Sequence, residues 1–340
     1  MATQKPVTIK DIAQQLKLSI STVSRALRGG TEMKPETKDA ILELAKALNY
    51  SPDPVALSLK EKKSKIIGVV VPEIANNFCS AVIAGIEDIG YKKGYHVMIF
   101  QSHEQYEREL MNTKLLASRR IDGLIISLSN ETNKYDHLHE IMEKGIPVVM
   151  FDRVCDEIKT HKVVINDYKA AFDATEHLLT QGFSNIAHVT AADFLSITKN
   201  RLEGYKAALK KRGIPFRQDL VLHSGFELNE MRVSFTSLLK AQKIDAILAS
   251  TERLTLHCLE ILKEMNLRIP EDVALIGFSD SPLNKLLSPS LSAVRQPTFE
   301  LGQKSMELLL ELIDKEPETF VTIEMETMLE VRRSTVSSDR

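Results

Sequence analysis

Apolar and polar positions follow two different patterns along the chain. Before residue 50, apolar residues recur at helical spacing in three short segments, at Ile12, Ala13 and Leu16, at Val23, Ala26 and Leu27, and at Ile41, Leu44, Ala45 and Leu48. From residue 65 onward, short runs of β-branched residues alternate with longer amphipathic stretches. The pattern therefore predicts a small all-α domain followed by a larger α/β region.

The first two helices have the pattern of a helix-turn-helix. Thr8 and Asp11 have the spacing of a capping box, and Ser19 is a good N-cap for the second helix. That helix carries polar side chains around its apolar stripe, at Ser21, Thr22, Ser24 and Arg25. Such a helix can enter the major groove of DNA, although helical hairpins inside ordinary protein cores look similar.

A third helix and a linker complete the first 65 residues. Pro35 opens the third helix and Asn49 ends it, so residues 1–50 form the predicted headpiece. Residues 51–65 are predicted to form a linker with a hinge helix of about two turns, which is marginal in water unless it is packed. A plain exposed linker is the alternative, but such linkers rarely need Val55, Leu57 and Leu59.

The α/β region, 66–340, divides into two similar sets of elements. The first set has strands near 66–71, 96–100, 123–127 and 147–150 and helices near 78–93, 105–118 and 134–143. The second has strands near 185–189, 246–249 and 273–277 and helices near 167–181, 199–212, 227–240 and 252–264, before a helix near 298–314 and closing strands from Phe320.

Buried parallel strands alternating with helices indicate doubly wound sheets. We expect an N-lobe of about 66–165 plus 297–325 and a C-lobe of about 166–296 plus the C-terminal strands. A ligand would bind between the lobes, where the carboxyl ends of the strands meet.

Composition and charge restrict the class of protein. The chain has 340 residues, of which 43% are hydrophobic and 26% charged, as in ordinary globular proteins. No apolar run approaches the roughly 18 residues of a membrane helix, so a cytoplasmic protein without a membrane partner is expected. The net charge is −2, but residues 1–65 hold 12 Lys and Arg against 7 Asp and Glu. The positive charge lies where DNA phosphates would be bound, although a solvated basic face would look the same.

Catalytic and metal-binding motifs are missing from the sequence. Cys79, Cys155 and Cys258 are odd in number and far apart, which predicts buried free thiols. His137 and His139 stand in a polar stretch and are interpreted as surface residues rather than metal ligands. The chain has no GxSxG, HExxH, P-loop or dinucleotide-binding fingerprint. We therefore expect no enzymatic activity, no cofactor and no metal.

Several motifs carry a resemblance to a known family. TIKDIA (8–13), STVSRAL (21–27), GVVVP (68–72), RLEGY (201–205) and IGFSD (276–280) occur in the order typical of the lactose/galactose-repressor (LacI/GalR) family of bacterial transcription regulators. The resemblance covers essentially the whole chain. It implies a helix-turn-helix headpiece on a two-lobed, periplasmic-binding-protein-like core, with the chain crossing three times between lobes.

The resemblance also implies DNA-contacting residues. Base-reading positions match Ile20, Ser21 and Arg25, and backbone contacts are expected at Thr8, Ser19, Thr22 and Ser24. In the hinge, Ala56 and Leu59 match minor-groove positions, with Leu59 as the wedge between two half-sites. Leu57 stands where the family usually has arginine, so that contact is in doubt.

Effector-contacting positions match residues at strand ends and helix starts. They are Phe78, Asp152, Arg201, Thr251, Ser279 and Asp280, which supply the aromatic, carboxylate and guanidinium groups that hydroxyl-rich ligands need. Ser279 stands where relatives have an aspartate that binds the ligand, and Thr251-Glu252 replaces an Asn-Asp pair. Asp280 or Glu252 would then supply the missing carboxylate.

The expected protein is a homodimeric regulator that acts as a repressor and binds a pseudopalindromic double-stranded operator and a carbohydrate effector. The polar tail 334–340 lacks leucine heptads, which favours a dimer over a tetramer. Two alternatives stay open: the same regulator controlled by a partner protein, and a ligand-binding or enzymatic α/β protein whose N-terminal helices serve assembly.

Overall fold

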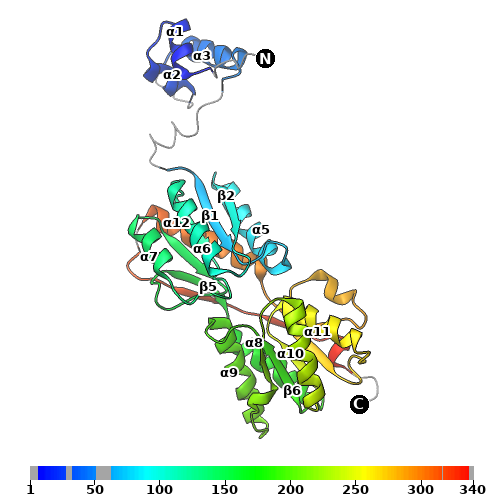
Figure 1. Cartoon of the computed structure of the whole chain (residues 1–340). Helices are drawn as coiled ribbons and strands as arrows, with labels where there is room; N and C mark the ends of the chain where they lie inside the picture. Colours follow the sequence, from blue (N-terminus) through cyan, green and yellow to red (C-terminus); the bar gives the residue numbers. More distant parts are fainter. Residues whose placement is uncertain (1–6, 28–32, 51–62, 316, 337–340) are drawn as a thin grey trace. The chain divides into compact units, whose positions relative to one another are not determined.

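The computed structural model describes residues 7–27, 33–50, 63–315 and 317–336. The chain divides into two compact units, Met1–Ser64 and Lys65–Arg340, and each is described by itself (Figure 1). Within the described residues, no helix is long and apolar enough to cross a membrane.

The first unit is a bundle of three helices, α1 (Ile9–Gln15), α2 (Ile20–Leu27) and α3 (Pro35–Ala47). The apolar stripes of these helices meet in one core, whose fully buried members include Ile12, Val23 and Ile41. The hinge positions Ala56, Leu57 and Leu59 lie outside the described residues.

The capping box at the start of α1 is confirmed. The backbone N–H of Thr8 and its hydroxyl each donate a 2.7 Å hydrogen bond to Oδ2 of Asp11. Both hydrogen bonds lower the pKa of the exposed Asp11 carboxyl, and the bond from the Thr8 backbone has the larger effect. Thr8 and Asp11 therefore determine where α1 begins.

The second unit has two lobes, each built on one six-stranded sheet. The N-lobe sheet has the order β11-β5-β4-β3-β1-β2 and all its strands are parallel. Its strands are β1 (Ile66–Val71), β2 (His96–Gln101), β3 (Gly123–Ile126), β4 (Val148–Phe151), β5 (His161–Ile165) and β11 (Thr322–Met325). The helices of this lobe are α5 (Asn77–Lys92), α6 (Tyr106–Ser118), α7 (Asp136–Glu143) and α12 (Thr298–Asp314).

The C-lobe sheet has the order β12-β10-β9-β8-β6-β7, and only its edge strand β12 is antiparallel among the described strands. Its strands are β6 (Ile186–Thr190), β7 (Val221–His223), β8 (Ala246–Ala249), β9 (Ala274–Phe278), β10 (Ser292–Arg295) and β12 (Met328–Glu330). Its helices are α8 (Asp167–Thr180), α9 (Ser196–Lys211), α10 (Leu228–Ala241) and α11 (Glu252–Glu264), with short 3-10 turns η1 (Gln218–Leu220), η2 (Pro282–Lys285) and η3 (Arg333–Thr335).

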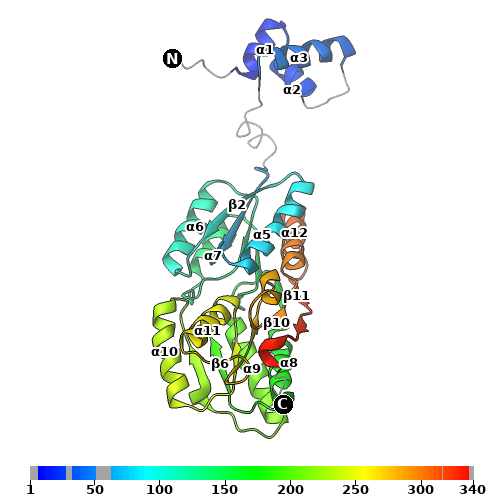
Figure 2. The same ribbon diagram turned by 90° about the vertical axis from the view of Figure 1, so that its right-hand side faces the viewer.

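The chain passes between the lobes three times, as the sheet order shows. It leaves the N-lobe after β5, returns after β10 to form α12 and β11, and crosses again to add β12 to the C-lobe. Figure 2 shows the N-lobe above the C-lobe, with α5 and α12 side by side in the N-lobe. The fold is therefore the two-lobed α/β architecture that the sequence predicts.

Three strands escape prediction from the sequence, namely β5, β7 and β10. Each has only three to five residues, and β7 lies at a sheet edge, so none presents a long apolar run. The prediction of a buried strand at 96–100 is wrong, because β2 is also an edge strand and its side chains are half-buried or exposed.

Glycine allows two helices of the C-lobe to approach each other closely. A Cβ atom at Gly204 of α9 would lie 2.2 Å from the backbone oxygen of Tyr168 in α8. The neighbouring Tyr205 is buried, donates a 2.8 Å hydrogen bond to the backbone oxygen of Ile186, and stacks on His188. The RLEGY segment thus anchors α9 to both the sheet and α8.

The side chain of His137 is buried, so its interpretation as a surface residue is wrong. Its Nε2 lies 2.9 Å from Oε1 of Glu109, whose other oxygen accepts hydrogen bonds from the backbone N–H and the hydroxyl of Ser129. His139 is exposed. The predicted buried free thiols are confirmed for Cys79, Cys155 and Cys258.

Candidate functional site

The first candidate site is the exposed face of α2. Val23 and Ala26 are buried against the other two helices, whereas Ile20, Ser21 and Arg25 are exposed. Ile20 keeps 47% of its surface exposed, so this helix presents an apolar side chain as well as polar ones. The helix therefore offers one apolar, one hydroxyl and one guanidinium group together, as base-edge contacts require.

Ser19 organises the start of this helix. Its Oγ accepts a 3.1 Å hydrogen bond from the backbone N–H of Thr22, which confirms Ser19 as the N-cap. The same oxygen lies 2.8 Å from Oγ of Ser21 and 2.7 Å from Oγ1 of Thr22. Ser24 is half-buried, so its side chain is less available than those of Ser21 and Arg25.

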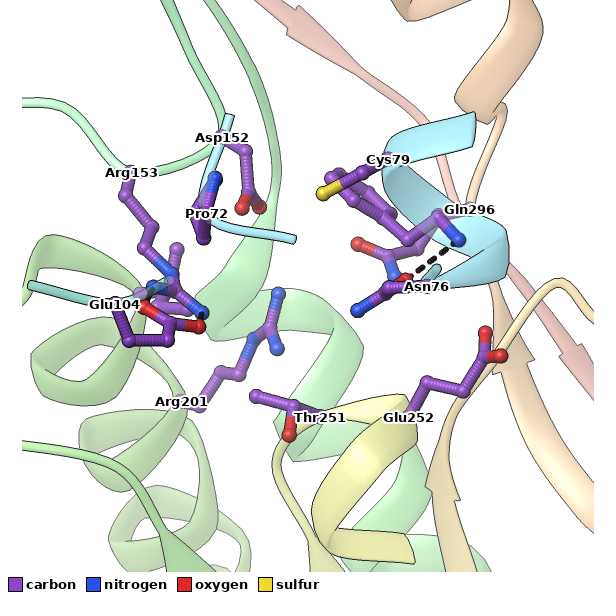
Figure 3. A pocket seen from close by; sticks show the side chains of 12 residues that line it. Pro72, Asn76, Cys79, Glu104, Asp152, Arg153, Arg201, Thr251, Glu252 and Gln296 are labelled. Carbon is purple, nitrogen blue, oxygen red and sulfur yellow. Dashed lines mark hydrogen bonds and ion pairs between the residues drawn. The ribbon is translucent and has the colours of Figure 1, made fainter. Parts of the chain in front are cut away.

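The second candidate site is a pocket between the two lobes. It is lined from the N-lobe and the C-lobe by Pro72, Asn76, Phe78, Cys79, Glu104, Asp152, Arg153, Ile197, Arg201, Thr251, Glu252 and Gln296. Figure 3 shows Asp152 and Arg201 extending into this pocket from opposite lobes. The lining combines carboxylates, guanidinium groups, amides and one aromatic ring, and such groups bind polyhydroxylated molecules well.

Arg201 is held firmly on the C-lobe side. Its Nε donates a 2.6 Å hydrogen bond to Oδ1 of Asp167, and its Nη1 donates to the backbone oxygen of Ser250. Its guanidinium carbon lies 3.8 Å from the centroid of the Phe278 ring. Burial raises the pKa of the Asp167 carboxyl to about 6, and the positive charge of Arg201 opposes that rise. The guanidinium is therefore fixed in orientation before any ligand binds.

Asp152 follows β4 in a left-handed backbone conformation, with φ of 56°. Asp and Asn adopt this conformation more readily than most other residues. Burial raises the pKa of the Asp152 carboxyl, while Arg153 and Arg201 oppose that rise. Among the described residues no group donates a hydrogen bond to this carboxylate.

The neighbouring Arg153 joins the two lobes. Its Nη1 and Nη2 donate to the two carboxylate oxygens of Glu104 at 2.6 and 3.2 Å. Its guanidinium carbon lies 5.4 Å from the ring centroid of Phe226, a C-lobe residue that also faces Arg253 at 5.6 Å. Movement of the lobes would therefore change the surroundings of a residue that lines the pocket.

Glu252 and Gln296 complete the C-lobe side of the pocket. Oε2 of Glu252 and Oε1 of Gln296 are buried and have no hydrogen-bond partner among the described residues. Burial raises the pKa of the Glu252 carboxyl, and a hydrogen bond from Ser279 opposes that rise. Thr251 lines the pocket and caps α11, accepting a 3.2 Å hydrogen bond from the N–H of Leu254.

The structure brings together four of the six predicted effector-contacting residues: Phe78, Asp152, Arg201 and Thr251 line the pocket. Ser279 does not line the pocket, and its side chain contacts Asn284, the backbone N–H of Ser281 and the lining residue Glu252. Asp280 is also outside the lining, since its two oxygens accept hydrogen bonds from Arg295 and Thr298 at 2.9 and 2.7 Å.

Sequence reasoning did not assign Asn76, Glu104 and Gln296 to the pocket. Glu104 follows β2, just as Asp152 follows β4. Polar residues after parallel strands lie at the edge of the sheet where ligands bind, so the sequence did contain a signal for Glu104. Gln296 follows β10, which was not predicted as a strand. Among the described residues, no group of three or more His, Cys, Asp or Glu side chains has the arrangement of a metal site.

Comparisons with known proteins show the family of this chain. Residues 8–53 match the model of bacterial regulatory proteins of the lacI family, and residues 175–335 match the periplasmic-binding-protein-like domain. The ribose operon repressor of Halalkalibacterium halodurans is 34% identical over 330 residues, which cover 96% of this chain and 97% of that protein.

Two solved structures are similar over nearly the whole length. A complex of the transcriptional regulator CelR with cellobiose has a TM-score of 0.72 and 26% identity, covering 96% of this chain and 99% of that one. The lac repressor dimer bound to operator and the anti-inducer ONPF has a TM-score of 0.84 and 22% identity, covering 98% and 100%, and supports the fold.

Proposed function

Because this chain belongs to the LacI family of bacterial regulatory proteins, we propose that its headpiece reads operator DNA under the control of a carbohydrate bound between the lobes. The observation that carries the DNA-binding part is the exposed face of α2. Ser21 and Arg25 lie on the side of the helix opposite the buried Val23 and Ala26, and Ile20 is exposed at the start of the helix. They are available to base edges while the apolar stripe holds the headpiece together.

Each side chain on this face suits a different contact. A guanidinium binds O6 and N7 of guanine with two hydrogen bonds, so we assign Arg25 to a guanine in each half-site. Ile20 suits the methyl group of thymine. Thr8, Ser19, Thr22 and Ser24 are assigned to the DNA backbone, where hydroxyl groups position the protein without reading sequence.

The protein works as a homodimer on a pseudopalindromic operator in this proposal. The lac repressor structure of similar fold is a dimer bound to operator. Two identical headpieces related by a twofold axis require two inverted half-sites. We also propose that Ala56 and Leu59 contact the minor groove. These two residues lie outside the described part of the chain.

Selection of binding sites from randomised double-stranded DNA tests base reading. Arg25→Ala should weaken binding to the selected operator by about tenfold or more and relax one position of each half-site. Lys46→Ala is the matched control, because Lys46 is an exposed basic residue at the end of α3. Identical site preferences for wild type and Arg25→Ala would contradict the assignment.

The effector part rests on the pocket between the lobes. Asp152 belongs to the N-lobe and Arg201 to the C-lobe, so a ligand that contacts both favours one arrangement of the lobes. Only such differential affinity can shift the equilibrium that the headpieces sense. A coupling free energy of roughly 1–3 kcal/mol would change operator affinity about 5- to 150-fold.

Operator titration by fluorescence anisotropy, with ribose, cellobiose and other sugars added, tests this part. Asp152→Asn should raise the sugar concentration needed for the response by about tenfold, because an amide replaces a charged acceptor. A change in operator affinity that no sugar produces, but that a protein from the same cell does, would favour the partner-protein alternative.

A further inference from the structure

The lining of the interlobe pocket has more hydrogen-bond acceptors than donors to satisfy them. The Asp152 carboxylate accepts no hydrogen bond from the described residues, and Oε2 of Glu252 and Oε1 of Gln296 are buried without partners. Buried polar atoms are normally paired, and an unpaired acceptor is costly in the absence of ligand. The pocket is therefore suited to a molecule that donates hydrogen bonds.

The positive charges in the pocket are already balanced by carboxylates of the protein. Arg201 is paired with Asp167 at 2.6 Å, and Arg153 is paired with Glu104 at 2.6 Å. Nε of Arg153 is a buried donor without a partner, so it can serve a ligand oxygen, but its charge is already neutralised. The charges that remain, on Asp152 and Glu252, are both negative.

The start of α11 gives a second reason to expect no bound anion. A helix N-terminus attracts phosphate or carboxylate groups through its unpaired N–H groups and its dipole. Here Thr251 caps the helix and Glu252 occupies its first turn beside the pocket. The side chains of the protein itself therefore supply the acceptor and the negative charge at this position.

From these features we infer that the effector is a sugar without phosphate or carboxylate groups, which donates hydroxyl or amino hydrogen bonds to Asp152 and Glu252. The inference rests on the proposed function and narrows its ligand class. A hydroxyl group both donates and accepts, so it can pair with Asp152 and with Nε of Arg153. A phosphate ester at neutral pH brings two further negative charges toward carboxylates that have no cation of their own.

Thermal unfolding of the ligand-free full chain tests the unpaired carboxylates directly. Glu252→Gln and Asp152→Asn should each raise the unfolding midpoint, by about 2 °C, because each removes a desolvated negative charge that forms no ion pair among the described residues. Asparagine keeps the left-handed backbone conformation at position 152. Glu104→Gln is the matched control and should lower the midpoint, since it breaks the ion pair with Arg153 and weakens the 2.8 Å hydrogen bond from the N–H of Asn130.

A lower midpoint for either Glu252→Gln or Asp152→Asn would show that the protein stabilises the negative charge of that carboxylate, and would overturn the inference for that residue. The second arm measures binding of matched probes by calorimetry at constant ionic strength: ribose against ribose 5-phosphate, and glucose and glucosamine against glucose 6-phosphate. Where the parent sugar binds, its phosphate ester should bind at least tenfold more weakly.

A phosphate ester that binds as tightly as its parent sugar would overturn the inference and leave the proposed carbohydrate effector standing. If no probe binds or alters operator affinity, the carbohydrate effector is contradicted, while the ligand-free unfolding comparison still decides whether the protein leaves the two negative charges without an ion pair. The two failures are therefore distinguishable.

Discussion

Nε of Arg201 donates a 2.6 Å hydrogen bond to Oδ1 of Asp167, and each side chain is only 3% exposed. The pair joins the pocket-lining helix α9 to the first turn of α8. A charge-assisted hydrogen bond in so dry a place stabilises the fold only while both partners are present. Arg201 therefore contributes to the stability of the C-lobe as well as to the proposed site.

Arg201→Ala should reduce the free energy of unfolding by about 3–5 kcal/mol, because it leaves the Asp167 carboxylate buried without its cation. Denaturant unfolding at pH 7 measures this loss. The double variant Arg201→Ala with Asp167→Ala should lose much less than the sum of the two single variants. Additive losses would contradict the proposed coupling.

The pH dependence of Arg201→Ala follows from the same pair. Burial already raises the pKa of Asp167 to about 6, and loss of Arg201 should raise it further. A carboxyl whose pKa is raised on folding loses stability as pH rises through that window, so the variant's deficit relative to wild type should shrink between pH 7 and pH 5. This stability effect also makes Asp152, rather than Arg201, the better residue for measuring a lost effector response.

Gly204→Ala should be strongly destabilising. The added Cβ would lie 2.2 Å from the backbone oxygen of Tyr168, so α8 and α9 must separate. Overpacking of this kind costs about 1–3 kcal/mol or more. Gly90→Ala in α5 is the control: its nearest neighbour, Cε of Met306, would be 3.4 Å away, so that variant should keep wild-type stability or gain up to about 1 kcal/mol.

Equal unfolding free energies for Gly204→Ala and Gly90→Ala would show that the helices can move apart freely. Gly204 and Arg201 lie on the same helix, α9, and their effects are linked. Close approach of α9 to α8 brings the guanidinium within reach of Asp167, so the glycine has an indirect influence on the pocket.

His188 should make the C-lobe sensitive to acid. Burial lowers its pKa to about 4, and its Nδ1 lies 3.1 Å from the backbone oxygen of Leu248, so the neutral ring donates there. The unfolded state, with a pKa near 6.5, binds the proton more readily. Stability from this group is therefore present above pH 6.5 and is lost as pH falls toward 4, by about 3 kcal/mol in total.

His188→Phe should remove this part of the pH dependence, although it also loses the hydrogen bond to Leu248. Denaturant unfolding of wild type and variant at pH 7 and pH 4.5 measures the difference. His139→Gln, at an exposed position, is the control and should follow wild type at both pH values. A wild-type-like pH dependence in His188→Phe would assign the acid sensitivity to other groups.

The sequence predicts the elements better than it predicts the directions of side chains. The position of Asp152 after β4 follows from the pattern of buried strands, whereas its left-handed backbone does not. Ser279 also follows a strand, but the η2 turn brings Asn284 against its side chain, and Ser279 does not line the pocket. The end of a strand indicates the edge of the sheet and leaves the local turn undetermined.

Partners distant in the sequence are the second part that could not be predicted. Asp167 is 34 residues from Arg201, and Glu109 is 28 residues from His137. Both pairs depend on how helices pack, which periodicity does not give. The polar neighbours of His137 predict a surface position. Its buried partner, the Glu109 carboxylate, belongs to another helix, α6, and is therefore not visible in the local sequence.

The last prediction concerns Ser19, whose single hydroxyl contacts the N–H of Thr22 and the hydroxyls of Ser21 and Thr22. Ser19→Ala should remove the N-cap and destabilise α2 by about 1 kcal/mol. Ser19→Asn should restore the cap, because asparagine is as good an N-cap as serine, but it lacks the hydroxyl that orients Ser21. Hydrogen exchange of residues 19–27 in the full chain should therefore accelerate in Ser19→Ala and stay near wild type in Ser19→Asn.

Operator affinity separates two roles of the Ser19 hydroxyl. If the hydroxyl also positions Ser21 and Thr22 for DNA, operator affinity should fall in both variants. If it acts through helix stability alone, operator affinity should fall only in Ser19→Ala. Unchanged exchange and operator affinity in Ser19→Ala would contradict both roles.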